Sequence, residues 1–514
     1  TMSGDHAGLC DGNRCLSYHH GPSMHSLTSS NPLPAYSKLP ASLKGYLPDF
    51  GMAVGLILLI NAVWLWVDPI LRIYMGDSMV FLQSTVMRGS AAERSYLYGL
   101  ALFYLHKPFA SAQAILAFNL LCAMLTSLAL FGWLRVFLRL PLWICLTATA
   151  LFCSEPAQVF MARMVMAETF GLAALIGTFG CLAFYLRTAN LLWFLLAVLM
   201  GLAAAALRTN FLPLVLGMSL VAALLCLFEQ PRHRARFGRF AAALALLVAT
   251  HIGYTQWYGR AVGQPAGYVA HTGMMAIGLV APLIKPEHFE GTGVSGEILK
   301  KVSLPLNDHW QRGNHIWSPK GLWAELSKAS PNAEMVARTV TRRAMLSDPI
   351  GLLKINVATL GGYFNQRKSD LRMQDDIGVI APDPYAIQVI RTWFNWDVSN
   401  LSRTESPARA YFKHAATWFK FCLFALLPLA LASMMIGWRR AERTQYLLLG
   451  FTSLGLLACH LLFVHIVSYR YLHPLPWFVL AHLAIIASWL LGRLPTKDPQ
   501  PQDRPASSSH AGHA

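Results

Sequence analysis

The sequence predicts an all-α membrane protein with about ten transmembrane helices, and three observations lead to this prediction. The chain of 514 residues is 55% hydrophobic and only 13% charged, whereas soluble domains average about 25% charged residues. Its apolar residues form runs of roughly 20, the length of helix that crosses a bilayer. Its net charge of +17 is spread in short basic clusters between those runs, which is typical of cytoplasmic loops and not of a nucleic-acid-binding surface.

Ten stretches are long and apolar enough, or nearly so, to cross a membrane. They are Phe50–Val67, Ala112–Trp133, Leu140–Cys153, Thr169–Leu186, Leu191–Leu207, Phe211–Phe228, Phe240–Trp257, Phe419–Trp438, Tyr446–Val467 and Leu472–Leu491. The third is the shortest, and its flanking Arg135 and Arg139 would have to snorkel to the interface or thin the bilayer locally.

The basic residues between these stretches indicate the orientation of the chain. With the N-terminus in the cytoplasm, every short basic connection falls on the cytoplasmic side, as the positive-inside rule requires. These connections contain Arg135 and Arg139; Arg187; Arg232, Arg234, Arg236 and Arg239; Arg439, Arg440 and Arg443; and Arg493 and Lys497. We therefore expect both termini to be cytoplasmic.

The sequence divides into tails, a membrane core and one long external segment. The polar tails are expected to be disordered, and the external segment is expected to be mostly helical, because parts of it place apolar residues at helical spacing. The expected regions are a cytoplasmic tail at 1–49, a transmembrane core at 50–257 with a first external loop at 68–111, an external region at 258–416, the last transmembrane helices at 417–492, and a cytoplasmic tail at 493–514.

No metal site is predicted from the spacing of ligand residues. Cys10 and Cys15 lie in the polar N-terminal tail, and no second ligand pair follows them at a standard distance. Asp375, Asp376 and Asp383 in the long external segment could bind a divalent ion, or they could form a solvated acidic patch.

Polar residues gather at four places on the non-cytoplasmic side, and each is a functional candidate because polar groups near hydrocarbon are costly. The first place follows the opening span and contains Asp77, Arg94 and Tyr98. Asp77 could accept a proton from an attacking hydroxyl, or it could be a solvated loop residue or a helix N-cap. Because carboxyl groups ordinarily ionise near pH 4, a useful base would need tuning by its surroundings.

The other three places pair arginines with acids or aromatics. Arg163 and Glu168 are five residues apart and could both face a cavity, although Glu168 could simply be favoured by the dipole of the helix it opens. Arg208 lies in a tight turn between two spans, where it could bind a phosphate or make a structural salt bridge. Arg470 stands between Tyr469 and Tyr471, which suits a phosphate or sugar site as well as an aromatic belt.

Taken together, these stretches resemble the polytopic GT-C glycosyltransferases, in particular the bacterial relatives of protein O-mannosyltransferases and aminoarabinose transferases. The resemblance covers residues 50–260 and 415–490. The matching positions are Asp77 with Phe81 and Gly89, Arg94 with Tyr98, Glu168, Arg208, and Tyr469-Arg470-Tyr471. The sequence departs from the family pattern at Ser78, where a second acid is expected, at Phe81, which is usually Tyr, and at Gly99, which is usually Pro.

The resemblance implies an inverting glycosyltransferase of the bacterial inner (plasma) membrane. Its donor would be a polyprenyl-phosphate-linked sugar, and its acceptor a lipid, glycan or protein on the periplasmic side. Asp77 would be the general base, and Glu168 would orient the acceptor or the base. The residues implied for the donor phosphate are Arg94, Arg208 and Arg470. Those implied for other substrate contacts are Tyr98, Arg163, Tyr469 and Tyr471.

The resemblance implies no cofactor other than a possible divalent metal, whose requirement stays open because Ser78 replaces the second acid. Membrane lipids are expected partners, and nucleic acid is not. A transporter or flippase would also account for ten helices, but it predicts inverted repeats with paired broken helices, which the sequence does not display. A polyprenyl-linked glycan ligase would also place arginines on large external loops, and a non-catalytic scaffold is the fourth hypothesis.

Overall fold

The computed structural model describes residues 43–87, 94–109, 111–229, 233–263, 265–378, 382–401 and 404–492. Within these ranges the regular structure is helical, apart from one isolated parallel bridge between Arg72 and Met164. Several predictions concern residues outside these ranges: the tails up to residue 42 and from residue 493, with Cys10 and Cys15, and Gly89 in the first external loop.

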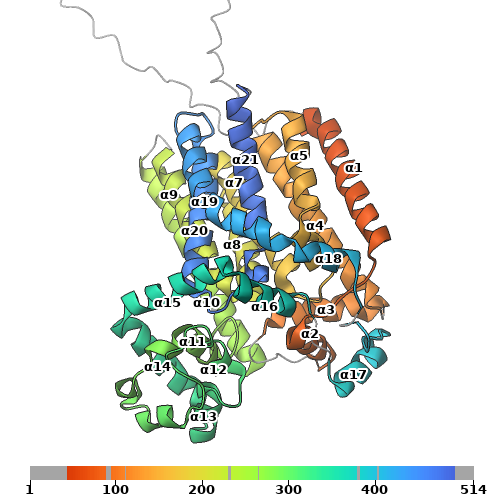
Figure 1. The fold of residues 1–514 in the computed structure, drawn as a ribbon. Helices are drawn as coiled ribbons and strands as arrows, with labels where there is room; N and C mark the ends of the chain where they lie inside the picture. Colours follow the sequence, from red (N-terminus) through yellow and green to blue (C-terminus); the bar gives the residue numbers. More distant parts are fainter. Residues whose placement is uncertain are drawn as a thin grey trace, which may run out of the picture. The chain divides into compact units, whose positions relative to one another are not determined.

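A bundle of helices corresponds to the ten predicted stretches (Figure 1). In the described part of the chain its members are α1 (Leu43–Val67), α4 (Gln113–Gly132), α5 (Leu142–Cys153), α7 (Ala167–Thr188), α8 (Leu191–Leu207), α9 (Leu212–Glu229), α10 (His233–Val262), α19 (Ala415–Gly437), α20 (Arg443–Phe463) and α21 (Leu475–Leu490). Their apolar composition explains their stability in lipid, where backbone groups must be paired within the helix.

Eight helical segments among the described residues are long and apolar enough to cross a membrane. They coincide with eight of the predicted stretches, so the prediction of a helical, multi-pass membrane protein is confirmed. The remaining two stretches form α5 with 12 residues and α8 with 17. Twelve residues of helix rise only about 18 Å, which is short of a hydrocarbon core of roughly 30 Å, so the count of ten spans stays a prediction.

Shorter helices form the connections at one end of the bundle. The predicted first external loop contains α2 (Met75–Met87) and α3 (Tyr96–Phe109), and α6 (Pro156–Met161) precedes α7. The long external segment contains α11 (Thr272–Val280), α12 (Asn314–Trp317), α13 (Leu322–Ala329), α14 (Ala333–Ser347), α15 (Pro349–Gly361), α16 (Gln366–Asp376), α17 (Pro384–Phe394) and α18 (Pro407–Lys413). Helices α11–α14 group together beyond the bundle, and α15 and α16 run across its end (Figure 1).

The long external segment contributes to two hydrophobic cores. Its first part, from Ile277 to Ala344, buries its own cluster of apolar side chains, as the helical spacing predicts. Its second part packs on the bundle, since Tyr363, Phe394 and Phe412 belong to the same buried cluster as the membrane helices. The region predicted at 258–416 therefore has two parts: the first has a hydrophobic core of its own, and the second packs on the helix bundle.

Between α20 and α21 the chain leaves the helical conformation at residues 464–468. The ninth predicted span, Tyr446–Val467, therefore ends as a helix at Phe463. Irregular backbone next to lipid needs other hydrogen-bond partners, because an unpaired buried carbonyl is costly. The buried Arg312 supplies them: its guanidinium donates to the carbonyls of Val464 (2.9 Å) and His465 (3.2 Å).

The same guanidinium ties the external helices to this segment. Its further acceptors are the Leu279 carbonyl in α11 at 2.9 Å, Asn356 Oδ1 at 3.0 Å and Thr359 Oγ1 at 2.8 Å, the last two in α15. At the last residue of the unwound segment, the Tyr363 hydroxyl donates to the Ser468 carbonyl at 2.9 Å and accepts from the Ser468 amide at 3.1 Å. The external helices thus provide the hydrogen bonds that the unwound segment lacks.

We expect Arg312→Gln to loosen the unwound segment, because the carbonyls of Val464 and His465 lose charged donors. The free energy of local opening at residues 464–468 should fall by about 3 kcal/mol, measured by hydrogen–deuterium exchange of the full chain. Arg342→Gln is the matched control because Arg342 is exposed. Equal exchange at 464–468 in the two variants would contradict this role of Arg312.

Candidate functional site

A cavity of about 510 Å³ opens where α2, α7, the α8–α9 turn and α11 meet the unwound segment. Six of the nine residues implied by the sequence line it, although they come from distant parts of the chain. They are Asp77, Arg94, Glu168, Arg208, Arg470 and Tyr471.

The charged groups in this cavity form one connected set of ion pairs. Asp77 lies between two guanidinium groups, with Arg94 Nη2 at 2.5 Å from Oδ1 and Arg470 Nη1 at 2.8 Å from Oδ2. Glu168 pairs with Arg208, and its Oε1 also lies 3.6 Å from Arg470 Nη1. Among the described residues that line the cavity, three positive charges face two negative ones, an arrangement that favours an anionic ligand.

Local structure places both carboxylates at helix N-termini. Asp77 lies in the first turn of α2 and Glu168 in the first turn of α7, where the helix dipole favours negative charge. The bridge at Arg72 holds the two segments together, since its amide donates to the Arg163 carbonyl at 2.7 Å and its carbonyl accepts from the Val165 amide at 2.9 Å. This pairing explains how residues 91 positions apart in the sequence share one cavity.

Arg208 reaches Glu168 because α7 leaves room for it. A Cβ atom at Gly171 would lie 2.9 Å from Arg208 Cγ, so a glycine one turn after Glu168 allows the arginine to lie against the helix. The Tyr471 ring also contacts both neighbouring arginines, with its centroid 5.3 Å from Arg208 Cζ and 5.1 Å from Arg470 Cζ. These cation–π contacts stabilise the arginines near one another despite their like charge.

Asp376 in α16 fixes the backbone that carries Arg470. Its carboxylate accepts hydrogen bonds from Ser468 Oγ at 2.8 Å and from the Tyr469 amide at 2.6 Å. Asp376 is buried, and burial raises its pKa to about 6. The interpretation of this residue as part of a solvated acidic patch is therefore wrong, because its carboxylate orders the turn before Arg470.

The Asp77 carboxyl group experiences two opposed effects. Burial raises its pKa, but the guanidinium groups of Arg470 and Arg94 lower it by more, so the pKa lies below the ordinary value of 3.8. Asp77 is therefore ionised at neutral pH in this structure. Its strength as a base depends on how firmly the two arginines hold it.

Three implied residues do not line the cavity. Arg163 is buried and donates to the carbonyls of Asp68 (2.8 Å) and Val159 (2.7 Å). Tyr98 packs edge-on against Phe81 at 4.8 Å. Tyr469 is buried and stacks on Phe419 at 5.7 Å. These three side chains therefore pack within the protein next to the cavity and do not line it.

Apolar side chains also line the cavity, and the sequence did not single them out. They are Leu207, Leu212, Pro213, Val269, Met275, Leu279 and Phe463. The α11 residues among them lie in the external segment, where nothing in the local pattern distinguishes a cavity wall from a core position. The combination of apolar side chains with a cluster of arginines suits a ligand with an anionic head and a hydrophobic tail.

Among the described residues, no group of three or more His, Cys, Asp and Glu side chains is arranged to hold a metal ion. Ser78, which stands in place of the family's second acid, is buried, and its hydroxyl donates to the Val165 carbonyl at 2.8 Å. Asp383 accepts from the Ala386 amide at the start of α17. Each of these candidate ligands therefore has a local structural role.

Comparison with protein-family models, with curated proteins and with solved structures found no match for this chain.

Asp376 should leave a signature in the pH dependence of stability. Because its folded-state pKa of about 6 lies above the ordinary value of 3.8, the folded protein binds more protons than the unfolded chain between these values. The Asp376 contribution to the free energy of unfolding therefore falls as pH rises through this window and is constant above it.

We expect Asp376→Asn to abolish this pH-dependent contribution. The difference in free energy of unfolding between wild type and variant should therefore change between about pH 4 and pH 6 and be constant above pH 6. Thermal unfolding of the full chain across this range measures it. Asp370→Asn is the control, since Asp370 is exposed on the same helix. A wild-type-to-variant difference that is the same at every pH would contradict the elevated pKa.

Proposed function

We propose that the chain is a GT-C-type membrane glycosyltransferase that moves a sugar from a polyprenyl-phosphate donor to a lipid, glycan or protein acceptor. One observation carries the proposal: the cavity at the end of the bundle joins Arg94, Arg208 and Arg470 to Asp77 and Glu168 beside apolar side chains. A polyprenyl-phosphate sugar has the matching parts, namely a phosphate, a hydrophobic chain and a reacting carbon next to the phosphate.

In this proposal the arginines stabilise the leaving phosphate. The acceptor hydroxyl oxygen attacks the anomeric carbon, the bond from that carbon to the phosphate oxygen breaks, and its electron pair leaves on the phosphate. Negative charge therefore grows on the phosphate as the bond breaks, and positioned guanidinium groups stabilise it most in the transition state. Planar guanidinium groups can bind phosphate through two parallel hydrogen bonds, which also fixes its orientation.

The proton of the acceptor hydroxyl passes to Asp77. In the free protein Arg94 and Arg470 hold this carboxylate and keep its pKa low, which describes a resting state. Donor phosphate that engages the same arginines weakens their hold on Asp77 and raises its pKa, so base strength would appear only when donor is bound. Glu168 keeps Arg208 and Arg470 in place from the other side.

Asp77→Asn is expected to reduce sugar transfer by a factor of about 100 to 10,000, the usual contribution of a positioned general base. In cells that depend on this chain, mass spectrometry of envelope lipids and glycans should show loss of a sugar-sized mass. The polyprenyl-phosphate sugar should accumulate at the same time.

The control for this test is Asp370→Asn at equal abundance in the membrane fraction, because Asp370 is exposed and lies outside the cavity. Full transfer by Asp77→Asn would rule out the base assignment. Accumulation of the sugar on the cytoplasmic face of the membrane, without loss of a transfer product, would instead favour a flippase.

The proposal includes ten spans in the bacterial inner membrane, with both termini cytoplasmic and the cavity on the periplasmic side. The short basic connections support it, since α4–α5 and α19–α20 connect at the end of the bundle away from α2 and α11 (Figure 1), two helices that line the cavity. The apolar helices α5 and α8, which pack among the longer ones, complete the ten.

Cysteine labelling tests this orientation. We expect Ser303→Cys in the external segment to react with a membrane-impermeant maleimide in intact spheroplasts, and Ala441→Cys between α19 and α20 to react only after lysis, since both positions are exposed. Cys10 and Cys15 are replaced by Ser in both variants, and the cysteines of the described residues are buried or half-buried. The reverse labelling pattern would overturn the proposed topology.

A further inference from the structure

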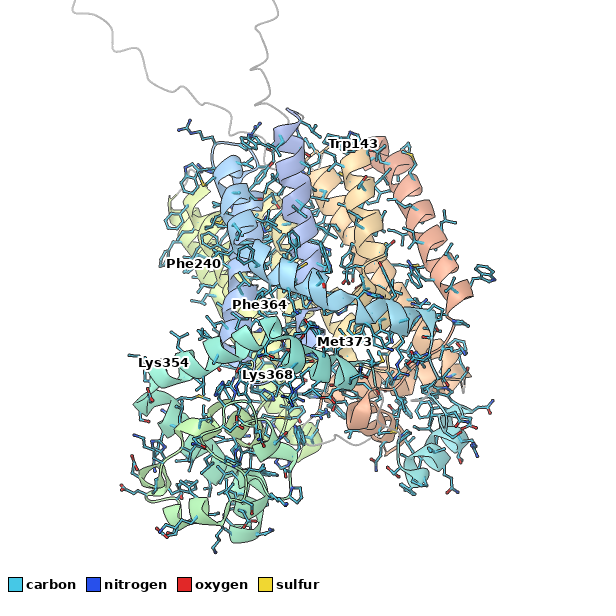
Figure 2. All side chains as sticks on the ribbon, in the orientation of Figure 1. Trp143, Phe240, Lys354, Phe364, Lys368 and Met373 are labelled. Atoms are coloured by element: carbon cyan, nitrogen blue, oxygen red, sulfur yellow. The ribbon has the colours of Figure 1, made fainter. Side chains whose placement is uncertain are left out.

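A second cavity of about 320 Å³ lies on the other side of the unwound segment. It is lined by the loop before α12, by α15 and α16, and by residues 465–467. Lys368 on α16, labelled in Figure 2, lines this cavity. His465 lines both cavities, so the unwound segment forms a common wall.

The polar groups of this second cavity have unused binding capacity. The Lys368 ammonium lies over the face of the Trp310 ring, and no acceptor among the described residues takes a hydrogen bond from it. His309 Nε2 is buried and also lacks a hydrogen-bond partner within the described residues. Arg372 pairs at 2.8 Å with Asp375, which also lines the cavity, so Lys368 carries the excess positive charge among the described lining residues.

These features select for a particular ligand chemistry. Lys368 and Arg372 around one space can bind a phosphate or carboxylate group, while Leu371, Ile466 and Val467 supply apolar surface for a ring. The volume is enough for a monosaccharide-sized group with its charge, by the usual scale of ligand pockets of about 300 Å³ and above. A neutral ligand would not engage the charge of the Lys368 ammonium.

We infer that this second cavity is an acceptor subsite that takes a sugar bearing a phosphate or carboxylate group. The inference rests on the proposed glycosyltransferase function, because an acceptor bound here would lie across the shared His465 wall from the donor cavity. The anionic sugar belongs either to a membrane-anchored glycolipid or to a soluble glycan. Both sources share the same binding chemistry.

Binding of small anionic sugars to the purified full-length chain in nanodiscs tests the subsite without any transfer reaction. The probes are glucose 6-phosphate, glucuronate and neutral glucose, and calorimetry gives their dissociation constants. We expect the two anionic sugars to bind more tightly than glucose. Lys368→Gln and Arg372→Gln should each weaken anionic binding about tenfold, the usual effect of losing one charge-assisted contact.

Two control variants locate the binding. Arg367→Gln removes an exposed charge next to Lys368 that does not line the cavity, and it should leave the dissociation constants unchanged. Arg208→Gln alters the donor cavity. In this variant Lys368→Gln should still weaken the binding of the anionic sugars about tenfold. Equal binding by wild type and by the Lys368→Gln/Arg372→Gln double variant would overturn the inference, as would equal affinity for glucose and glucose 6-phosphate.

The source of the sugar is resolved by competition. Nanodiscs that contain phosphatidylinositol, a lipid whose headgroup joins an anionic phosphate to a sugar-sized cyclic polyol, should weaken glucose 6-phosphate binding if the acceptor is membrane-anchored. Unchanged binding indicates a soluble glycan, and both results retain the subsite. If Asp77→Asn leaves sugar transfer intact while Lys368→Gln weakens binding, the proposed base fails and the subsite stands. If Asp77→Asn abolishes transfer while the Lys368 variants bind normally, the subsite fails alone.

Discussion

The hydrogen bonds of Arg312 to the unwound segment between α20 and α21 are the interaction on which the rest of this structure depends. Backbone that leaves the helical conformation at the edge of a membrane bundle must find donors for its carbonyls. Arg312 satisfies Val464 and His465 at once and also holds α11 and α15. A buried arginine with five acceptors has few other conformations open to it, so the external helices have a defined position on the bundle.

That constraint reaches the charged cavity through a short chain of contacts. At the end of the unwound segment, Asp376 in α16 accepts hydrogen bonds from Ser468 and from the Tyr469 amide. The next residue is Arg470, which contacts both Asp77 and Glu168. The external segment therefore does more than cover the bundle. It orients the arginine that connects the two carboxylates and supplies the α11 side of the cavity.

The cavity also explains how acids and arginines can share a small space at the edge of a membrane. Each carboxylate lies at a helix N-terminus and faces guanidinium groups, so its negative charge is stabilised both by the helix dipole and by ion pairs. The remaining excess of positive charge is what an anionic donor would use. The acids and arginines are paired with one another in the free protein, and the proposed chemistry depends on a phosphate that displaces part of this pairing.

The sequence by itself determined the membrane class, the positions of the apolar helices, and the acids and arginines of the cavity, because hydropathy and the cost of polar groups near lipid act on local composition. It did not distinguish Arg163, Tyr98 and Tyr469, which pack next to the cavity, from the residues that line it. The roles of Arg312 and Asp376 were decided only by tertiary structure, since each pairs with backbone about 90 or more residues away. The spacing of apolar residues along the sequence does not predict contacts between residues so far apart.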